Sequence, residues 1–354
     1  MKRKNNLTIK IGKQKIGAGF PVFIVAEISG NHNGSFKRAK DLVKAACESG
    51  ADAIKLQTYT PDTLTIDSTK KYFQVKTNPA WKGKTLYELY KEAYTPWNWQ
   101  PELKKIAESY RIPLFSTPFD KSAVDFLEKL KIPVYKIASF ETGDIELLKK
   151  VASTKKPVII SRGITSFKEL ALAISTLKEN GSSSIAILHC ISSYPARPEE
   201  MNLSTIPAIR KRFNVVTGIS DHSLGISAAI ASVVLGASII EKHFTLKRSD
   251  GGPDAAFSLE PHEFKNLIKS VRETEKAIGT PQFTIGKEES KNIIFRRSLF
   301  ITKNIKIGQE FTRENVRCIR PGYGLSCKYL PKVLNKKAAK NIEKGTPLSW
   351  KLIS

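Results

Sequence analysis

Two histidines, His222 and His243, each stand at the end of a short apolar run, within GISDHS and EKHFTL. Neutral imidazoles bind divalent metals well, and both runs read as neighbouring parallel strands whose ends meet at one rim. We therefore predict a divalent cation on these two side chains, completed by water or by a carboxylate from Glu27, Asp221 or Asp254. The alternative is that each histidine only hydrogen-bonds a neighbouring strand.

Two lysines and two serines lie at the ends of other predicted strands: Lys55, Lys136, Ser139 and Ser161. Ammonium groups together with hydroxyl donors form a cradle for phosphate and carboxylate groups. A competing interpretation makes one lysine a Schiff-base nucleophile, because desolvation beside another cation lowers the pKa of a lysine.

Eight short, apolar and β-branched runs must position these residues. Each run is followed by an amphipathic stretch, which is the pattern of alternating strands and helices. Because the runs are almost continuously hydrophobic, they indicate a parallel sheet buried on both faces. The runs cover residues 21–30, 51–57, 112–120, 132–139, 156–163, 184–190, 214–222 and 237–244.

One helix is expected after each strand. Most strands follow one another at intervals of roughly 20 to 30 residues, which favours a closed (β/α)₈ TIM barrel over an open sheet. In such a barrel the catalytic groups belong at the carboxyl ends of the strands. The expected helices cover residues 36–49, 101–110, 121–130, 144–153, 166–179, 204–212, 225–235 and 262–278.

The domain organisation follows from two departures from this repeat. Residues 58–99, rich in aromatic residues, threonine and lysine, read as an insertion over the barrel mouth that forms either a substrate wall or a dimer contact. After the barrel, residues 1–280, we expect a linker at 281–290. Residues 291–354 have short, turn-punctuated strands and predict a small, mostly β domain.

The composition narrows the class of protein. The 354 residues carry a formal net charge of +25, with 41% hydrophobic and 26% charged residues. No apolar run approaches the roughly 18 residues of a membrane span, and the basic start lacks the apolar stretch of a secretory signal. We therefore expect a cytoplasmic protein. Because the lysines are scattered and not clustered with aromatic residues, the charge favours anionic substrates over nucleic acid.

The four cysteines are Cys47, Cys190, Cys318 and Cys327. They are far apart in sequence and form no CxxC pair, which argues against a disulfide framework and against a zinc knuckle. Reduced, structural thiols are the expectation.

Seven segments, in order, resemble the sialic-acid synthase family, whose members join phosphoenolpyruvate to an N-acetylated sugar. They are AEISGNHNG (26–34), IKLQTY (54–59), FSTPFD (115–120), YKIASFE (135–141), GISDHS (218–223), EKHFTL (241–246) and GGPDAAFSLEP (251–261). RRSLF (296–300) and IRPGYG (319–324) resemble the family's C-terminal SAF domain, which is related in fold to type III antifreeze proteins. The resemblance covers essentially the whole chain.

The resemblance implies a role for each matching residue. His222 and His243 match ligands of Mn²⁺ or Mg²⁺, with Co²⁺ as an alternative. Arg320 matches an arginine that reaches a neighbouring subunit's site, which implies a domain-swapped homodimer. The family positions that bind phosphoenolpyruvate correspond here to Lys55, Gln57, Thr117, Lys136, Ser139 and Ser161. The family positions that contact the sugar correspond to Glu27, Tyr194 and Asp254.

Within the family, SGNH (29–32), YTPWNW (94–99) and SDGGPDAAFS (249–258) are similar to the pseudaminic acid synthase branch. This branch condenses phosphoenolpyruvate with a 2,4-diacetamido-2,4,6-trideoxy-hexose of the altrose type. Carbon–carbon bond formation and C–O cleavage give a nine-carbon acid and phosphate. Neuraminate and legionaminate synthesis remain alternatives. Glu141, with Glu27 as second choice, is expected to act as the general base.

Two positions depart from the family pattern. Arg162, in SRGI, follows a serine where the family usually has Ser-Thr-Gly, and Ser192 stands where many members have asparagine. The arginine could add a phosphate contact or point outwards. A further alternative makes the C-terminal domain a separate binding module with no part in catalysis.

Overall fold

The computed structural model describes residues 7–76 and 81–354. It forms two compact units, Met1–Gly279 and Thr280–Ser354, and each is described by itself. The basic start of the chain, residues 1–6, and residues 77–80 of the predicted insertion lie outside the described residues.

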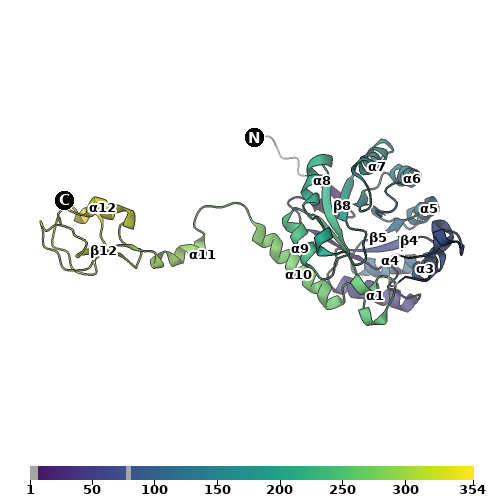
Figure 1. Cartoon of the computed structure of the whole chain (residues 1–354), viewed down its shortest axis with the longest axis horizontal. Helices are drawn as coiled ribbons and strands as arrows, with labels where there is room; N and C mark the ends of the chain where they lie inside the picture. The colour runs from purple at the N-terminus through teal and green to yellow at the C-terminus, as the bar shows by residue number, and fades with distance from the viewer. Residues whose placement is uncertain (1–6, 77–80) are drawn as a thin grey trace. The chain divides into compact units, whose positions relative to one another are not determined.

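The first unit contains a closed barrel of parallel strands in the order β10-β3-β4-β5-β6-β7-β8-β9 (Figure 1). The predicted (β/α)₈ fold is therefore confirmed, with one strand in each of the eight apolar runs. Nearly every strand residue is buried, as the continuous hydrophobic runs require. The strands are β3 (Phe23–Glu27), β4 (Ala53–Thr58), β5 (Leu114–Pro118), β6 (Tyr135–Ile137), β7 (Val158–Arg162), β8 (Ile185–Cys190), β9 (Val216–Asp221) and β10 (Ile239–His243).

The register of the strands brings polar residues from distant parts of the sequence to one end of the barrel. Glu27, the last residue of β3, is aligned with His243 of β10 on one side and with Lys55 of β4 on the other. Gln57 of β4 is aligned with Thr117 of β5. Because all eight strands are parallel, their carboxyl ends meet at the same rim.

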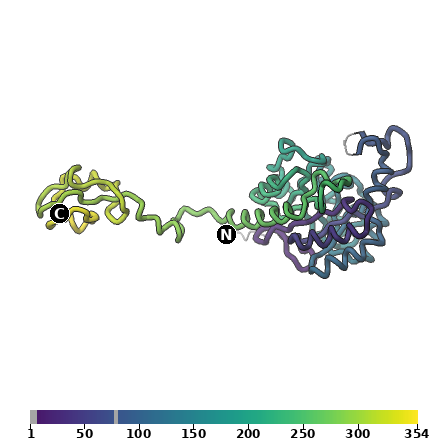
Figure 2. The backbone as a smooth tube through the Cα atoms, turned by 90° about the horizontal axis from the view of Figure 1, so that it is seen from below, coloured from purple at the N-terminus to yellow at the C-terminus, as the bar shows by residue number. Residues whose placement is uncertain are grey.

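Each barrel strand is followed by a helix, and the helices surround the barrel (Figures 1 and 2). Local caps define several helix starts: the Asp120 side chain accepts hydrogen bonds from backbone amides at the start of α5, and Ser166 and Glu169 form a capping box in α7. The helices are α1 (Phe36–Glu48), α4 (Gln100–Ser109), α5 (Lys121–Lys129), α6 (Ile145–Ser153), α7 (Phe167–Glu179), α8 (Thr205–Phe213), α9 (Ser227–Val234) and α10 (Pro261–Ile278).

A hairpin of β1 (Thr8–Ile11) and β2 (Gln14–Gly17) precedes the barrel and was not predicted from the sequence. Its side chains Ile9, Ile11 and Ile16 are buried in one apolar cluster with residues of the barrel strands. The hairpin lies beside the residues at which β8 and β9 begin. It therefore covers the amino-terminal end of the strands, opposite the polar rim.

The insertion between β4 and α4 contains α2 (Pro61–Leu64), η1 (Lys71–Phe73), α3 (Leu86–Ala93) and η2 (Trp97–Trp99). Capping boxes begin both α2 and α3. Trp97 fastens the insertion to the barrel, since its indole donates a hydrogen bond to the Tyr59 carbonyl at 3.1 Å and packs on Phe126.

The second unit is small and has short strands, as expected. β11 (Ser298–Ile301) pairs antiparallel with β12 (Val316–Ile319), and α12 (Leu330–Val333) and several bridges complete the unit. Leu299, Ile301 and Phe311 belong to its own apolar core. α11 (Lys287–Ser290) is a single helical turn within the predicted linker.

The cysteine prediction was wrong for two residues, because Cys318 and Cys327 form a disulfide. Their Cα atoms lie 5.5 Å apart, within the range that a disulfide spans. The spacing of nine residues gave no CxxC signal, and the pairing depends on the turn between β12 and η7 (Cys327–Tyr329). Cys47 and Cys190 are free and buried, as expected.

Across residues 7–76 and 81–354, no helix combines the length and the apolar character needed to traverse a bilayer.

Candidate active site

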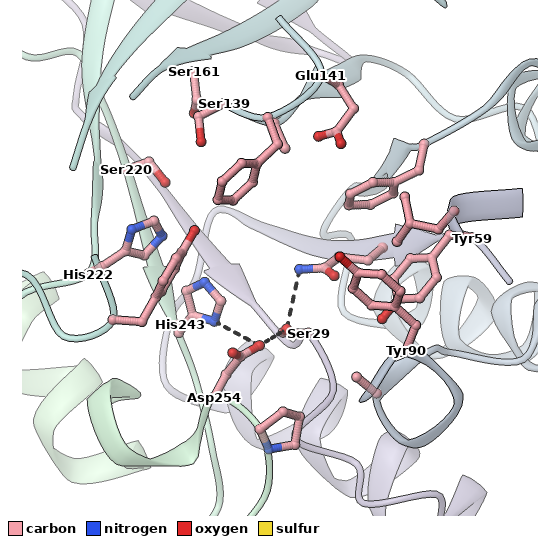
Figure 3. A pocket seen from close by; sticks show the side chains of 18 of the residues that line it. Ser29, Tyr59, Tyr90, Ser139, Glu141, Ser161, Ser220, His222, His243 and Asp254 are labelled. Carbon is pink, nitrogen blue, oxygen red and sulfur yellow. Dashed lines mark hydrogen bonds and ion pairs between the residues drawn. The ribbon is translucent and has the colours of Figure 1, made fainter. Parts of the chain in front are cut away.

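A cavity of about 390 Å³ opens at the carboxyl ends of the barrel strands (Figure 3). This is the position at which barrel enzymes place their active sites. Ten of the thirteen predicted site residues line it: Lys55, Gln57, Lys136, Ser139, Glu141, Ser161, Tyr194, His222, His243 and Asp254. The remaining three are Glu27 and Thr117, which contact Lys55, and Arg320, which lies in the second unit.

His222 and His243 lie next to each other, with ring centroids 5.3 Å apart, on one side of the cavity (Figure 3). Nδ1 of His222 lies 3.0 Å from the Ile191 carbonyl oxygen. This contact fixes the orientation of the ring and does not involve Nε2. Nδ1 of His243 is buried and has no hydrogen-bond partner among residues 7–76 and 81–354. Burial, together with the neighbouring His222, lowers the pKa of His243 far below its usual value, so this imidazole is neutral.

The donor set fits a divalent metal. Two neighbouring imidazoles, one of which is buried with an unpaired ring nitrogen, are suitable nitrogen ligands. Among the described residues no three His, Cys, Asp or Glu side chains gather as a complete ligand set. Any ion on the two histidines would therefore keep several positions for water or substrate oxygens, as catalytic metal sites do.

Asp221, one of the carboxylates considered as a third ligand, is occupied elsewhere. Its Oδ2 accepts a hydrogen bond from Lys242 Nζ at 2.9 Å, and its Oδ1 accepts from the Ser223 backbone amide and hydroxyl. Both Asp221 and Lys242 are fully buried. This buried pair holds the segment that follows β9, and so it positions His222, the next residue of the chain.

Two lysines and two glutamates form a buried charge cluster at the base of the cavity. Lys55 Nζ lies 2.6 Å from Glu27 Oε2 and 3.4 Å from Glu241 Oε1, and Lys136 Nζ lies 3.6 Å from the same Glu241 oxygen. Ser220 donates a hydrogen bond to Glu241 at 3.0 Å. Glu241 therefore links the two lysines, a function that sequence reasoning did not assign to it.

The charges of this cluster are set by opposing effects. Burial disfavours a charged Lys55, but the carboxylates of Glu241 and Glu27 outweigh burial and raise its pKa. Burial lowers the pKa of Lys136 and raises that of Glu27, although nearby charges oppose both shifts. If Glu27 held a proton, the two lysines would face only the negative charge of Glu241. The resulting excess of positive charge would favour the binding of an anion.

Hydroxyl groups line the cavity beside the lysines. Ser161 Oγ is buried and has no hydrogen-bond partner in the part of the chain that the structure describes, so it can donate to a substrate. Ser139 shares a hydrogen bond of 2.7 Å with Ser192, the residue that departs from the family pattern. Thr117 does not line the cavity, and its hydroxyl accepts a hydrogen bond from Lys55 at 3.3 Å. The structure thus brings together the residues of the predicted anion cradle, and Thr117 contacts the cradle through Lys55 without lining the cavity.

Glu141 faces the cavity from the loop that follows β6 (Figure 3). Burial raises the pKa of Glu141 to about 7, although the charge of Lys136 opposes the shift. Its Oε2 atom is buried, and no described residue forms a hydrogen bond with it. A carboxyl group whose pKa lies near neutrality is well suited to accept and return a proton.

Tyr194 and Asp254 approach the histidines from two loops. The Tyr194 ring packs on His222 with centroids 4.5 Å apart. Oδ2 of Asp254 accepts a hydrogen bond from Ser29 and lies 3.8 Å from Nδ1 of His243. Gln57 in turn donates to Ser29 at 3.2 Å, so residues of three different loops and strands are connected across the cavity (Figure 3).

Several residues that line the cavity were missed by sequence reasoning. Ser220 is one residue before Asp221 in GISDHS and points the other way, since side chains alternate along a strand. Cys190, at the end of β8, is buried beside His222, with its sulfur 3.8 Å from Nδ1. Trp81 comes from the insertion, where no periodic pattern marked it.

Comparison with known proteins places this geometry in a family. The model of the NeuB family matches residues 42–283, and that of the SAF domain matches residues 296–354. A pseudaminic acid synthase from Campylobacter jejuni is 43% identical over 327 residues, covering 92% of this chain and 95% of the relative. An N,N'-diacetyllegionaminic acid synthase from Legionella pneumophila is 36% identical, covering 95% and 96%.

A solved structure is similar over most of the chain. The N-acetylneuraminic acid synthetase of Leptospira borgpetersenii, in complex with citrate, has a TM-score of 0.72 and 32% identity, covering 81% of this chain and 95% of that one. The barrel, the SAF domain and these matches lead to one conclusion: the chain belongs to the NeuB family.

Proposed function

We propose that this protein condenses phosphoenolpyruvate with a 2,4-diacetamido-2,4,6-trideoxy-hexose of the altrose type to give pseudaminic acid and phosphate. One observation carries the proposal. Two buried lysines and two adjacent imidazoles line a single cavity at the carboxyl ends of the strands. The higher identity to a relative named pseudaminic acid synthase than to one named legionaminic acid synthase supports this acceptor over its isomers.

Phosphoenolpyruvate would lie over the charge cluster. Lys55 and Lys136 would neutralise its phosphate and carboxylate, and the free hydroxyl of Ser161 would donate a hydrogen bond to one of them. Glu241 keeps the two ammonium groups at distances of 3.4 and 3.6 Å from a shared oxygen. The anion therefore meets preformed positive charge, and the lysines need no reorganisation when it binds.

The acceptor aldehyde would lie against His222 and His243. When bound there, a divalent metal such as Mn²⁺ or Mg²⁺, or Co²⁺ as an alternative, supplies Lewis-acid polarisation of the aldehyde oxygen. Tyr194, packed on His222, and Asp254, beside His243, restrict where the sugar can lie. This positioning brings the aldehyde carbon to C3 of phosphoenolpyruvate, with which it forms the new bond.

Water must then add to C2 of the former phosphoenolpyruvate before phosphate leaves by C–O cleavage. Glu141, ionised above a pKa of about 7, is the general base that accepts the proton of this water. Glu27 is the second choice, but its pairing with Lys55 at 2.6 Å commits it to the charge cluster.

The assembly is part of the proposal. Arg320 is exposed in the loop that follows β12, and we propose that it enters the site of a second copy in a domain-swapped homodimer. In that arrangement its guanidinium would bind the acetamido region of the sugar. We also propose that the enzyme acts in the cytoplasm.

An acceptor panel tests the proposed reaction. Phosphate release from phosphoenolpyruvate is measured with the altrose-type diacetamido sugar, with the legionaminate precursor isomer and with N-acetylmannosamine. The first should give the highest kcat/KM. Highest activity with another acceptor would replace the pseudaminate assignment, and release of phosphate with no acceptor would contradict the condensation. Borohydride in the presence of pyruvate should trap no adduct, because no lysine forms a Schiff base in this account.

The metal is tested by binding as well as by activity. Equilibrium dialysis of the metal-free protein against Mn²⁺ should find one ion per chain, and His243→Ala should remove it while thermal unfolding stays near that of the wild type. Full activity after exhaustive chelation would contradict a metal role.

A further inference from the structure

The cavity has two chemically different walls. The barrel strand ends supply charged and polar groups, whereas the insertion between β4 and α4 supplies mostly apolar side chains. Figure 3 shows this division, with His222 and His243 on one side of the cavity and the rings of Tyr59 and Tyr90 on the other. The apolar wall is formed by Tyr59, Leu64, Val75, Trp81, Leu89 and Tyr90. None of these side chains takes part in the proposed bond-forming and bond-breaking steps.

Trp81 connects the apolar wall to the loop that carries Asp254. Its indole Nε1 donates a hydrogen bond to the Pro253 carbonyl at 3.0 Å, and its ring lies 6.0 Å from that of Tyr194. Pro253 packs closely against Gly30, where an added Cβ would meet the Pro253 side chain at 2.7 Å. Trp81 therefore bridges the cavity from the insertion to the loops around the histidines.

The reacting ends of both substrates must lie among the polar groups. Phosphoenolpyruvate needs the lysines, and the aldehyde of the acceptor needs the histidines. The end of the sugar remote from its aldehyde must then extend toward the remaining, apolar wall. A hydroxymethyl group buried there would lose its hydrogen bonds to water, whereas a methyl group would gain by burial.

We propose that Trp81 is a specificity-determining residue, whose indole face receives the remote, methyl-bearing end of the acceptor and selects a 6-deoxy sugar over its 6-hydroxy counterpart. This inference rests on the proposed function, since it concerns the acceptor of that same site. Beyond the proposed function, one residue of the insertion is assigned the discrimination between acceptors, and the discrimination concerns the substituent on C6 of the sugar.

The test compares two acceptors that differ only at C6: the diacetamido-trideoxy-hexose and the same sugar with a 6-hydroxyl. The quantity measured is the ratio of their kcat/KM values. The wild type should favour the 6-deoxy sugar roughly tenfold or more, the range expected for an apolar contact of this size. In Trp81→Ala this ratio should fall close to one, with the KM for phosphoenolpyruvate changed less than about twofold because the lysines are untouched.

Two further variants separate the apolar contact from other effects. Trp81→Phe keeps an aromatic face but cannot donate to Pro253, so it should retain most of the preference. Tyr72→Ala removes another aromatic side chain of the insertion, one that is 77% exposed and does not line the cavity, and should leave the ratio unchanged.

The outcomes are distinguishable. An unchanged ratio in Trp81→Ala, or a full loss in Trp81→Phe, overturns the inference while the proposed function stands. A wild-type enzyme that releases phosphate with neither acceptor overturns the proposed function and this inference together. Thermal unfolding of each variant, expected near that of the wild type, verifies that the ratios come from folded protein.

Discussion

At the residue scale, the chemistry depends on charges that the barrel buries and balances. Glu241 contacts both Lys55 and Lys136, and these lysines outweigh burial and lower its pKa, so Glu241 stays ionised. A buried pair of ammonium groups would otherwise repel each other in a site of low polarity. The carboxylate thus lets two cations share one cavity wall, where an anionic substrate can reach them.

Glu141 provides a pH-dependent prediction. Its pKa is raised to about 7, so the carboxyl is protonated below that pH and ionised above it. Because a general base must be ionised, kcat should rise from pH 6 to pH 8 with a midpoint near 7. Glu141→Gln should lower kcat by roughly 10²–10⁴-fold.

The measurement is the pH profile of phosphate release by both proteins. The residual activity of Glu141→Gln should lack the limb near pH 7. If the limb persists in the variant, another group titrates there and Glu141 is not the base.

At the element scale, the strands could be predicted because their buried runs are continuous, and a parallel barrel fixes where their ends lie. His222, His243, Lys55 and Lys136 could therefore be assigned to one rim from sequence position alone. Glu241 could not be assigned in this way, since its link between two lysines depends on side-chain distances. Trp81 could not be predicted, since the insertion has no repeat that indicates which side chains face the cavity.

The disulfide of the second unit provides a prediction about stability. It links β12 to η7 and closes a loop of about ten residues, for which chain-entropy estimates give about 2–3 kcal/mol. Cys318→Ser should lower the free energy of unfolding of this unit by about that amount, and reduction of the wild type should have the same effect.

Denaturant unfolding with and without reductant measures this effect. Reductant should leave Cys318→Ser unchanged, which makes the variant its own control. Equal stability of the oxidised and reduced wild type would contradict the stabilising bond.

At the scale of the whole molecule, the two units were expected from the change in sequence pattern near residue 280, and the structure contains two compact units. How copies assemble depends on surfaces that carry no periodic signal, so the homodimer and the cross-subunit position of Arg320 stay predictions. Complementation between two variants with different defects tests them.

His243→Ala lacks a proposed metal ligand but keeps Arg320, whereas Arg320→Ala keeps His243 and lacks the arginine. In a domain-swapped dimer, mixed copies contain one intact site, so exchange of subunits should restore about a quarter of wild-type activity when variants are mixed equally. Without mixing, Arg320→Ala should raise the KM for the sugar more than that for phosphoenolpyruvate. No gain on mixing, despite proven subunit exchange, would place Arg320 outside the partner's site.

The fate of the bridging oxygen of phosphoenolpyruvate shows which bond breaks when phosphate leaves. The substrate is labelled with ¹⁸O between C2 and phosphorus and is incubated with the diacetamido sugar, and the released phosphate and the nine-carbon acid are analysed by mass spectrometry. Labelled phosphate and the nine-carbon acid should form in equal amounts, because water adds to carbon and the C–O bond breaks. Unlabelled phosphate, or labelled phosphate formed without the sugar, would contradict the proposed condensation.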